Sequence, residues 1–198
     1  MKKEKILKKL LGPWTDLEKM KEFKNSKHKF LDRDRTLKIN WTRLHTRIPE
    51  VLLNDKKQKV LDVASGNGAT MEIMRYYGHD VEGVDFSPGF EEGDWLYRPM
   101  IESQGLKCQT HNCSITPYPF EDKEFDFVIC YGAITFFKPI KSWPEFMDEF
   151  ARISKNGMLI GVNVGKNFDE GQKYLDAWRH PEFKLASKTG SIYKWVKK

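Results

Sequence analysis

Cysteine is scarce in this chain of 198 residues, and the few thiols have no recognisable spacing. Cys108, Cys113 and Cys130 are odd in number and include no Cys-x-x-Cys pair. Disulfide-stapled domains and zinc modules need paired or closely spaced thiols, so this pattern is typical of neither. We therefore expect reduced thiols, no metal site and a cytoplasmic location.

Long apolar runs are also missing. No segment approaches the roughly 20 apolar residues that cross a bilayer, and the Lys-rich N-terminus lacks the apolar core and cleavage site of a secretory signal. The sequence therefore predicts no integral membrane segment. With 39% hydrophobic and 31% charged residues, the chain has the composition and length of one globular unit.

The N-terminal arm, residues 1–29, has too few acidic residues to balance the charge of its lysines. This arm has ten lysines and four acidic residues, so it carries the whole net charge of +6 and leaves residues 30–198 neutral. A basic protein favours nucleic acid when its cations cover a large face, whereas these belong to one arm. The alternatives are that the arm is a solvated helix or tail, or that it contacts an acidic partner or membrane surface. We expect residues 1–12 to add charge without packing.

Residues 60–70 combine a buried strand, a glycine turn and a helix start in the order Val-Leu-Asp-Val-Ala-Ser-Gly-Asn-Gly-Ala-Thr. Gly66 and Gly68 permit a turn that side chains would obstruct, and a helical pattern resumes over 69–77. Such a turn presents bare N–H groups to a nucleotide-like ligand. Met71 occupies the third position of a dinucleotide fingerprint, so that motif is incomplete.

A second short strand, residues 81–87, ends in a carboxylate about 20 residues after the turn. Asp85 at that position can accept hydrogen bonds from both hydroxyls of a ribose. The alternative is that Asp85 caps the helix that we expect to begin after Pro88.

These two segments resemble the first two motifs of class I S-adenosylmethionine-dependent methyltransferases. In that comparison Asp62 is the acid of the first motif, Ala64 replaces the usual first glycine, and Gly66 and Gly68 hold the other two glycine positions. In the second motif Asp85 holds the ribose and the next side chain, Phe86, lies along the adenine. The resemblance implies S-adenosyl-L-methionine as cofactor and S-adenosyl-L-homocysteine as product.

The resemblance continues toward the end of the chain. It implies a polar contact to the adenine from Asn112 or Ser114, with Cys113 between them, and presentation of the methyl group at the end of the fourth strand, Cys130-Tyr131. The stretch from Pro117 to Asp126 is similar to the signature that leads into that strand.

The predicted fold is α/β: a three-layer class I methyltransferase (Rossmann-like) fold, with a mostly parallel sheet and a C-terminal antiparallel hairpin. After the first two strands we expect strands at 106–111, 125–130 and 158–164, a helix capped by Ser142 and stopped at Asn156-Gly157, a helix at 168–178, and a hairpin around Thr189-Gly190. We divide the chain into a helical cap, 1–50, and a cofactor-binding domain, 51–198, that form a single structural unit.

Within the cap, a capping box at Thr15 and Glu18 predicts a helix start. Apolar residues from Leu37 to Val51 recur every three or four positions, with Pro49 as an interruption. The resemblance makes this region a cover for the acceptor, so the candidate substrate residues are Trp41, Arg43, His45, Thr135 and Phe136. Core packing is the common alternative for such a tryptophan.

The sequence identifies no catalytic residue. Related small-molecule enzymes often carry a histidine after the fourth strand, whereas this chain has Ile134-Thr135-Phe136, which leaves His111, Tyr131 and His45 as possible bases. Cys130-Tyr131-Gly132-Ala133 also lacks the Pro-Pro-aromatic motif of adenine-amino enzymes. We therefore favour a small-molecule acceptor. The alternatives are an RNA or protein methyltransferase that docks through the basic arm, and a catalytically inactive cofactor-binding module. The oligomeric state stays open.

Overall fold

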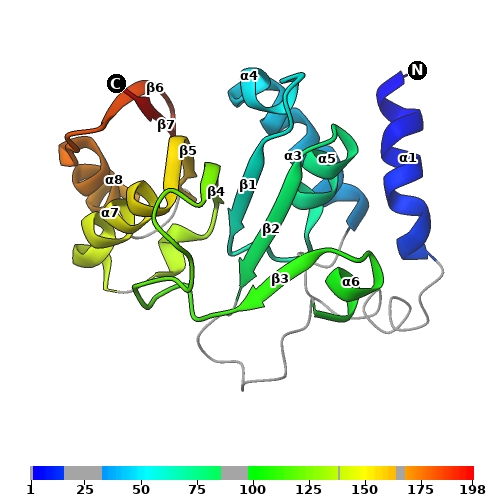
Figure 1. Cartoon of the computed structure of the whole chain (residues 1–198), viewed down its shortest axis with the longest axis horizontal. Coiled ribbons are helices and arrows are strands. Elements are labelled where there is room, and N and C mark those ends of the chain that lie inside the picture. Colours follow the sequence, from blue (N-terminus) through cyan, green and yellow to red (C-terminus); the bar gives the residue numbers. More distant parts are fainter. Residues whose placement is uncertain (1, 16–32, 86–97, 138, 164–167) are drawn as a thin grey trace.

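The computed structural model describes residues 2–15, 33–85, 98–137, 139–163 and 168–198, and all structural statements below concern these residues. Seven strands form one sheet in the order β3-β2-β1-β4-β5-β7-β6 (Figure 1). The strands are β1 (Lys59–Val63), β2 (Asp80–Asp85), β3 (Lys107–Thr110), β4 (Phe125–Tyr131), β5 (Ser154–Gly161), β6 (Phe183–Thr189) and β7 (Ile192–Lys197).

The pairing of the strands confirms the predicted fold class. The pairs β1–β2, β1–β4, β2–β3 and β4–β5 are parallel, whereas β5–β7 and β6–β7 are antiparallel. Parallel neighbours need crossover connections, and the helices that supply them cover the sheet faces. The carboxyl ends of β1, β2 and β4 consequently meet at one edge, which points downward in Figure 1.

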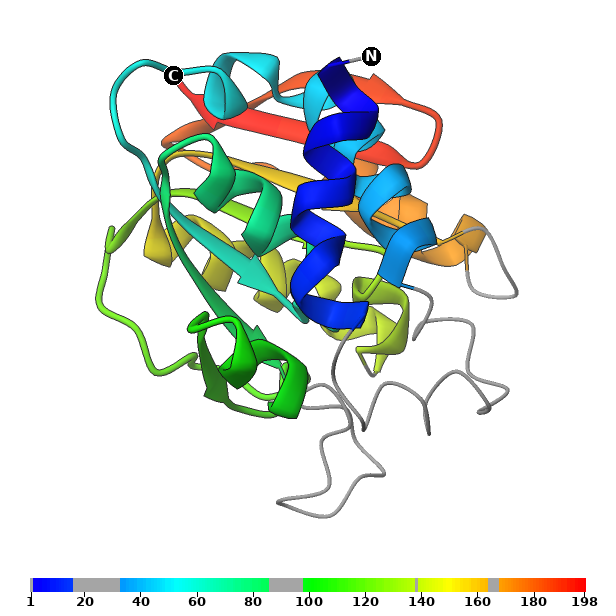
Figure 2. The ribbon, with the colours of Figure 1, turned by 90° about the vertical axis from the view of Figure 1, so that its right-hand side faces the viewer.

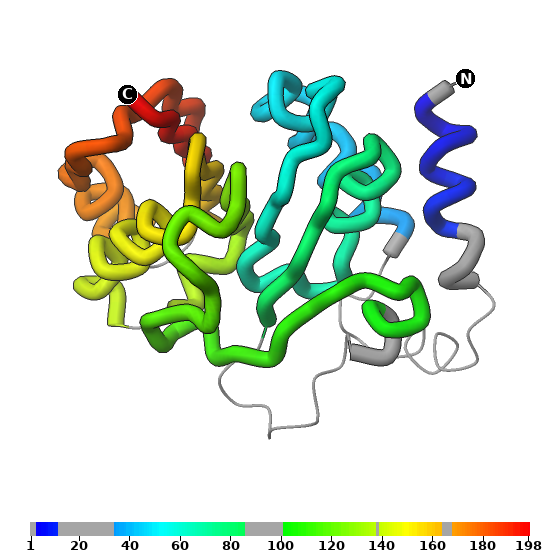
Figure 3. Tube along the Cα trace, in the orientation of Figure 1, coloured from blue at the N-terminus to red at the C-terminus, as the bar shows by residue number. Residues whose placement is uncertain are grey.

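Helices cover both faces of the sheet. They are α1 (Lys2–Thr15), α3 (Arg33–Arg47), α4 (Pro49–Leu52), α5 (Ala69–Tyr76), α6 (Arg98–Ser103), α7 (Trp143–Ile153) and α8 (Phe168–Ala177), with short 3₁₀ turns η2 (Ile134–Phe136) and η3 (Ile140–Ser142). Figure 2 shows α1 and α3 side by side on one face. In the tube of Figure 3, α1 lies at the right of the molecule, and α7 and α8 lie in its left half.

Side-chain alternation along the strands divides the core into two layers. Val60 of β1 packs with the helices α1, α3 and α5, whereas its neighbour Leu61 packs with α7 and α8. The apolar face predicted between Leu37 and Val51 is buried in the first layer, and the chain breaks between α3 and α4 at Pro49 as expected.

The predicted stop at Asn156-Gly157 is wrong. Helix α7 ends at Ile153 and β5 begins at the next residue, so Asn156 and Gly157 belong to the strand. Gly157 is required there for packing, because a Cβ atom would lie 2.7 Å from both the Phe127 ring and a β7 carbonyl. Ser142 does precede α7, but its side chain makes no capping hydrogen bond.

The N-terminal arm contributes packing as well as charge, contrary to our expectation for residues 1–12. Leu7 is only 5% exposed and lies in the core layer that α1 shares with α3. Lys5, Lys8 and Lys9 are exposed on the same helix. Thr15 ends the described part of α1, and Glu18 of the predicted capping box lies outside the described residues.

Candidate functional site

The turn that follows β1 has an unusual backbone. Ala64, Gly66 and Gly68 have φ angles of 56°, 54° and 71°, all in the left-handed region. Glycine adopts this region freely, whereas alanine does so at a cost of about 1–2 kcal/mol. The N–H of Ala64 donates to the carbonyl of Val84 at 2.7 Å, which ties the turn to the end of β2.

The two glycines of the turn face different surroundings. A Cβ atom on Gly68 would lie 2.5 Å from Cδ1 of Ile101, so the absence of a side chain there serves packing. A Cβ atom on Gly66 would meet no atom of the described residues within 4 Å. Gly66 therefore presents its main chain outward at the sheet edge, where a ligand can approach it closely.

Two buried carboxylates flank this turn. The Gly66 N–H donates to Oδ2 of Asp85 at 2.5 Å, and burial raises the pKa of Asp85 to about 6 in spite of this bond. Burial also raises the pKa of Asp62 well above its ordinary value, and the charge of Asp85 adds to the effect. Hydrogen-bond donors from a ligand, such as ribose hydroxyls, would relieve this desolvation at Asp85.

The residues after β3 provide a second set of polar groups. Oδ1 of Asn112 accepts a hydrogen bond of 3.0 Å from the N–H of Ser114. Cys113 is buried between them, with its thiol directed at the Val84 carbonyl. The Ser114 hydroxyl is buried and has no hydrogen-bond partner in the described structure. Buried hydroxyls are normally hydrogen-bonded, so this one has room for a partner that the described residues do not supply.

Two neighbouring side chains at the end of β4 lie in different surroundings. Cys130 is fully buried, and burial raises the pKa of its thiol well above the ordinary value, so it is a packing residue rather than a nucleophile. Tyr131 is partly exposed, and the guanidinium of Arg43 lies 3.7 Å from its ring centroid. In η2 the Thr135 hydroxyl is buried with no hydrogen-bond partner among the described residues, and Phe136 is 60% exposed.

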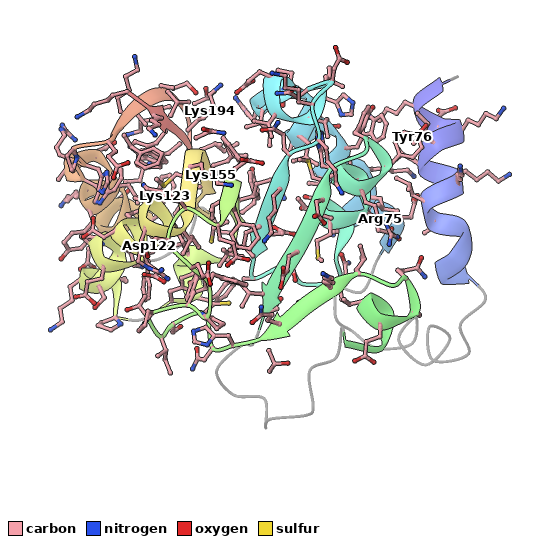
Figure 4. All side chains as sticks on the ribbon, in the orientation of Figure 1. Arg75, Tyr76, Asp122, Lys123, Lys155 and Lys194 are labelled. Carbon is pink, nitrogen blue, oxygen red and sulfur yellow. The ribbon has the colours of Figure 1, made fainter. Side chains whose placement is uncertain are left out.

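Trp41 and His45 lie apart from this edge. The His45 ring stacks on Trp41, its Nδ1–H donates to the Trp41 carbonyl, and its Nε2 accepts from the Tyr77 hydroxyl at 2.8 Å. Figure 4 shows Tyr76, which precedes Tyr77, at the upper end of α5, opposite the strand ends. Both ring nitrogens of His45 are engaged, so this placement favours packing over a role as base or lid.

At most one ring nitrogen of His111 can act as a base. Its Nε2–H donates to the Ile115 carbonyl at 2.8 Å, and its ring packs edge-on against Tyr118. Phe86 lies outside the described residues. Among the described residues, no group of three or more His, Cys, Asp or Glu side chains could hold a metal ion.

Sequence reasoning missed residues that shape the turn. Oδ1 of Asn67 accepts from the Ala69 N–H, and its Nδ2 donates to the Thr36 hydroxyl at 3.3 Å, which links the turn to α3. An asparagine between two glycines is a turn signal that could have identified this role. Asn163 similarly donates to the Gly132 carbonyl at 2.6 Å and holds the loop after β4.

A cavity of about 620 Å³ opens beside the end of β4, between α1 and α3. It is lined by Lys3, Glu4, Leu7, Lys38, Ile39, Thr42, Arg43, Thr46, Arg47, Tyr131 and Ile192. Tyr131 ends β4, which runs parallel to β1 and β2, so this wall of the cavity lies at the same end of the sheet as the glycine turn and Asp85. No helix in the described part of the chain is long and apolar enough to cross a membrane.

Comparison with known proteins identifies the family of this arrangement. Residues 61–161 match the profile of a methyltransferase domain. An uncharacterised Haemophilus influenzae protein is 30% identical over 126 residues, which cover 62% of this chain and 49% of the relative. The chain therefore spans about half the length of the curated relative that it matches.

Solved structures share the fold. Magnesium protoporphyrin IX methyltransferase from Synechocystis, solved with its bound methyl donor, aligns over 97% of both chains at 12% identity with a TM-score of 0.58. A candidate S-adenosyl-L-methionine-dependent methyltransferase from Methanococcus maripaludis aligns over 88% of this chain and 96% of its own, at 15% identity and a TM-score of 0.55. A Pyrococcus horikoshii protein aligns over 79% and 88%, at 20% identity and a TM-score of 0.54.

Proposed function

The chain belongs to the methyltransferase domain family, the S-adenosylmethionine-dependent enzymes of class I fold, and we propose that it methylates a small molecule. When bound, S-adenosylmethionine would supply an electrophilic methyl group on a positively charged sulfonium, and S-adenosylhomocysteine would be the product once that methyl is on the acceptor atom. The work of the protein is to bind, orient and exclude water around the two reactants.

The observation that carries the cofactor assignment is the convergence of three features at one sheet edge. They are the left-handed turn at Gly66, the buried carboxylate of Asp85 beside it, and the orphaned hydroxyl of Ser114. The carboxylate suits the ribose hydroxyls, and the hydroxyl suits the polar edge of the adenine. These residues therefore fit the cofactor.

The order of the strands supports a direction for the cofactor. Asp85 ends β2, the glycine turn follows β1, and Tyr131 ends β4, on the other side of β1 from β2. With the ribose at Asp85, we place the sulfonium near Tyr131 and the cavity beside it. Holding two reactants in a near-attack arrangement contributes roughly 7–11 kcal/mol in favourable cases.

Two features support a small acceptor. The cavity volume of about 620 Å³ lies within the range of small-molecule sites, roughly 300–1,000 Å³. The sequence after β4 also lacks the Pro-Pro-aromatic motif of adenine-amino enzymes. Methylation of RNA or protein through the exposed lysines of α1 is the second enzymatic candidate, and a cofactor-binding module without transfer is the third.

Two measurements test this proposal. Calorimetric titration with S-adenosylmethionine and S-adenosylhomocysteine should show binding at a single site. In the second measurement, the protein and labelled donor are incubated with a cell extract, which is then separated into small-molecule, RNA and protein fractions. We expect the label in the small-molecule fraction. Binding without transfer to any fraction would support the inactive module, and label in RNA or protein would replace the proposed acceptor.

A further inference from the structure

Arg43 and Tyr131 form a layered contact at the end of β4. The Arg43 guanidinium lies 3.7 Å from the centroid of the Tyr131 ring, which is cation–π geometry. The Tyr131 ring also lies close to the main chain of β5, since a Cβ atom on Gly161 would be 2.7 Å from a ring carbon. The strand and the ring thus fix the guanidinium at the wall of the cavity.

The charge of Arg43 has no acidic partner in the part of the chain that the structure describes. Its Nη1 donates to Oδ1 of Asn40 at 3.0 Å, a neutral acceptor. No ion pair among the described residues includes Arg43. An arginine has five N–H donors in a planar fork. Arg43 is half-buried and therefore partly desolvated, with donors left for an anion.

The remaining cavity wall has two kinds of side chain. Lys3, Lys38 and Arg47 add positive charge, and Glu4 is the single acid among the lining residues. Lys38 is already paired with Asp34 on its own helix. Leu7, Ile39 and Ile192 supply apolar surface in the same lining. A cavity of this composition suits a molecule with an anionic group on an apolar body.

We propose that the methyl acceptor is a small anionic molecule, with a carboxylate or phosphate group on an apolar body, and that Arg43 binds its anion. This inference rests on the proposed function, because it places the acceptor at the end of β4. Arg43 acts as a specificity residue in this arrangement: its fork fits both oxygens of a carboxylate. Carboxylate and phosphate share this chemistry, and the experiment distinguishes them.

Binding is tested first, without any need for turnover. Protein saturated with S-adenosylhomocysteine is titrated with benzoate, phenyl phosphate and the uncharged benzamide. We expect one of the two anions to bind better than benzamide, and Arg43→Gln to weaken that anion about 10- to 150-fold, the range for hydrogen bonds to a charged group. Arg43→Lys should lose less. The control is Arg179→Gln, because Arg179, in the described structure, donates to two main-chain carbonyls at the end of α8 and lies outside the cavity lining.

Turnover supplies the second arm. Labelled small-molecule product from an extract should be retained on an anion exchanger, and Arg43→Gln should raise the KM for this acceptor while changing kcat little. Equal binding of benzamide and the anions, an unchanged Arg43→Gln variant, or label in neutral molecules or RNA would overturn the inference. The affinity of each variant for S-adenosylhomocysteine is measured separately. If the wild type itself does not bind S-adenosylhomocysteine, the result contradicts the proposed function instead.

Discussion

The N–H of Gly66 donates a 2.5 Å hydrogen bond to Oδ2 of Asp85 and so joins the turn after β1 to the end of β2. The two residues are 19 positions apart in the chain, but parallel pairing of β1 and β2 brings them together. This bond fixes one carboxylate oxygen, and no described residue is seen to donate a hydrogen bond to the other. Asp85 thereby connects the shape of the turn to the chemistry of binding.

Replacement of Asp85 should weaken cofactor binding. A hydrogen bond to a charged group contributes about 1.5–3 kcal/mol, so Asp85→Asn should lower the affinity for S-adenosylhomocysteine about 10- to 150-fold. Calorimetric titration measures this change. Asp80→Asn is the matched control, because Asp80 lies exposed at the opposite end of the same strand. Equal affinity of a folded Asp85→Asn protein and the wild type would remove Asp85 from the site.

The same carboxyl should make stability depend on pH. Because the pKa of Asp85 rises from an ordinary 3.8 to about 6 on folding, the folded protein binds the proton more tightly than the unfolded chain. The free energy of unfolding should therefore fall as pH rises from about 4 to 6 and level off above it, by up to about 3 kcal/mol. The raised pKa of Asp62 acts in the same direction.

Chemical denaturation of the wild type and Asp85→Asn at several pH values isolates this effect. Asparagine cannot ionise, so the variant should gain stability relative to the wild type as pH rises through that window. A constant difference between the two proteins from pH 4 to 7.5 would show that Asp85 does not titrate as its burial implies.

Gly66 and Gly190 form a matched pair for testing the turn. Their φ angles are 54° and 58°, and within the described part of the chain a Cβ atom at either position would meet no atom within 4 Å. Gly66→Val and Gly190→Val should therefore cost similar stability, about 1–2 kcal/mol from the left-handed backbone. Only Gly66→Val should abolish binding of S-adenosylhomocysteine. Tight binding by a well-folded Gly66→Val protein, checked by circular dichroism, would exclude close approach of the cofactor to this turn.

The lysines of α1 should be dispensable for chemistry. Deletion of residues 1–12 would remove the buried Leu7, so the test neutralises charge instead, with Lys5, Lys8 and Lys9 all changed to Gln. We expect unchanged cofactor affinity, stability and methyl transfer. Transfer measured at low and moderate salt completes the comparison. A loss of transfer to RNA in this variant, together with steep salt sensitivity in the wild type, would favour the RNA alternative.

Local patterns predicted most of the elements and part of the site. The strand, the Gly66-x-Gly68 turn and the helix after it were readable because each depends on backbone preferences and apolar spacing over a few residues. The stop at Asn156-Gly157 was wrong because the same dipeptide fits a strand where the Phe127 ring and a β7 carbonyl leave no room for a side chain. Packing of α1 was missed because a Lys-rich composition concealed the burial of Leu7.

The sequence by itself determined the family motifs, the alternation of strands and helices, and the chemical identity of the groups at the strand ends. Tertiary structure decided which of those groups share surroundings. It placed Arg43 on the Tyr131 ring and His45 against Tyr77, although both come from one helix that the sequence had assigned to the cover. The physical reason is that periodicity fixes which residues share a helix face, whereas contact between distant segments depends on how the helix is rotated and seated against the sheet.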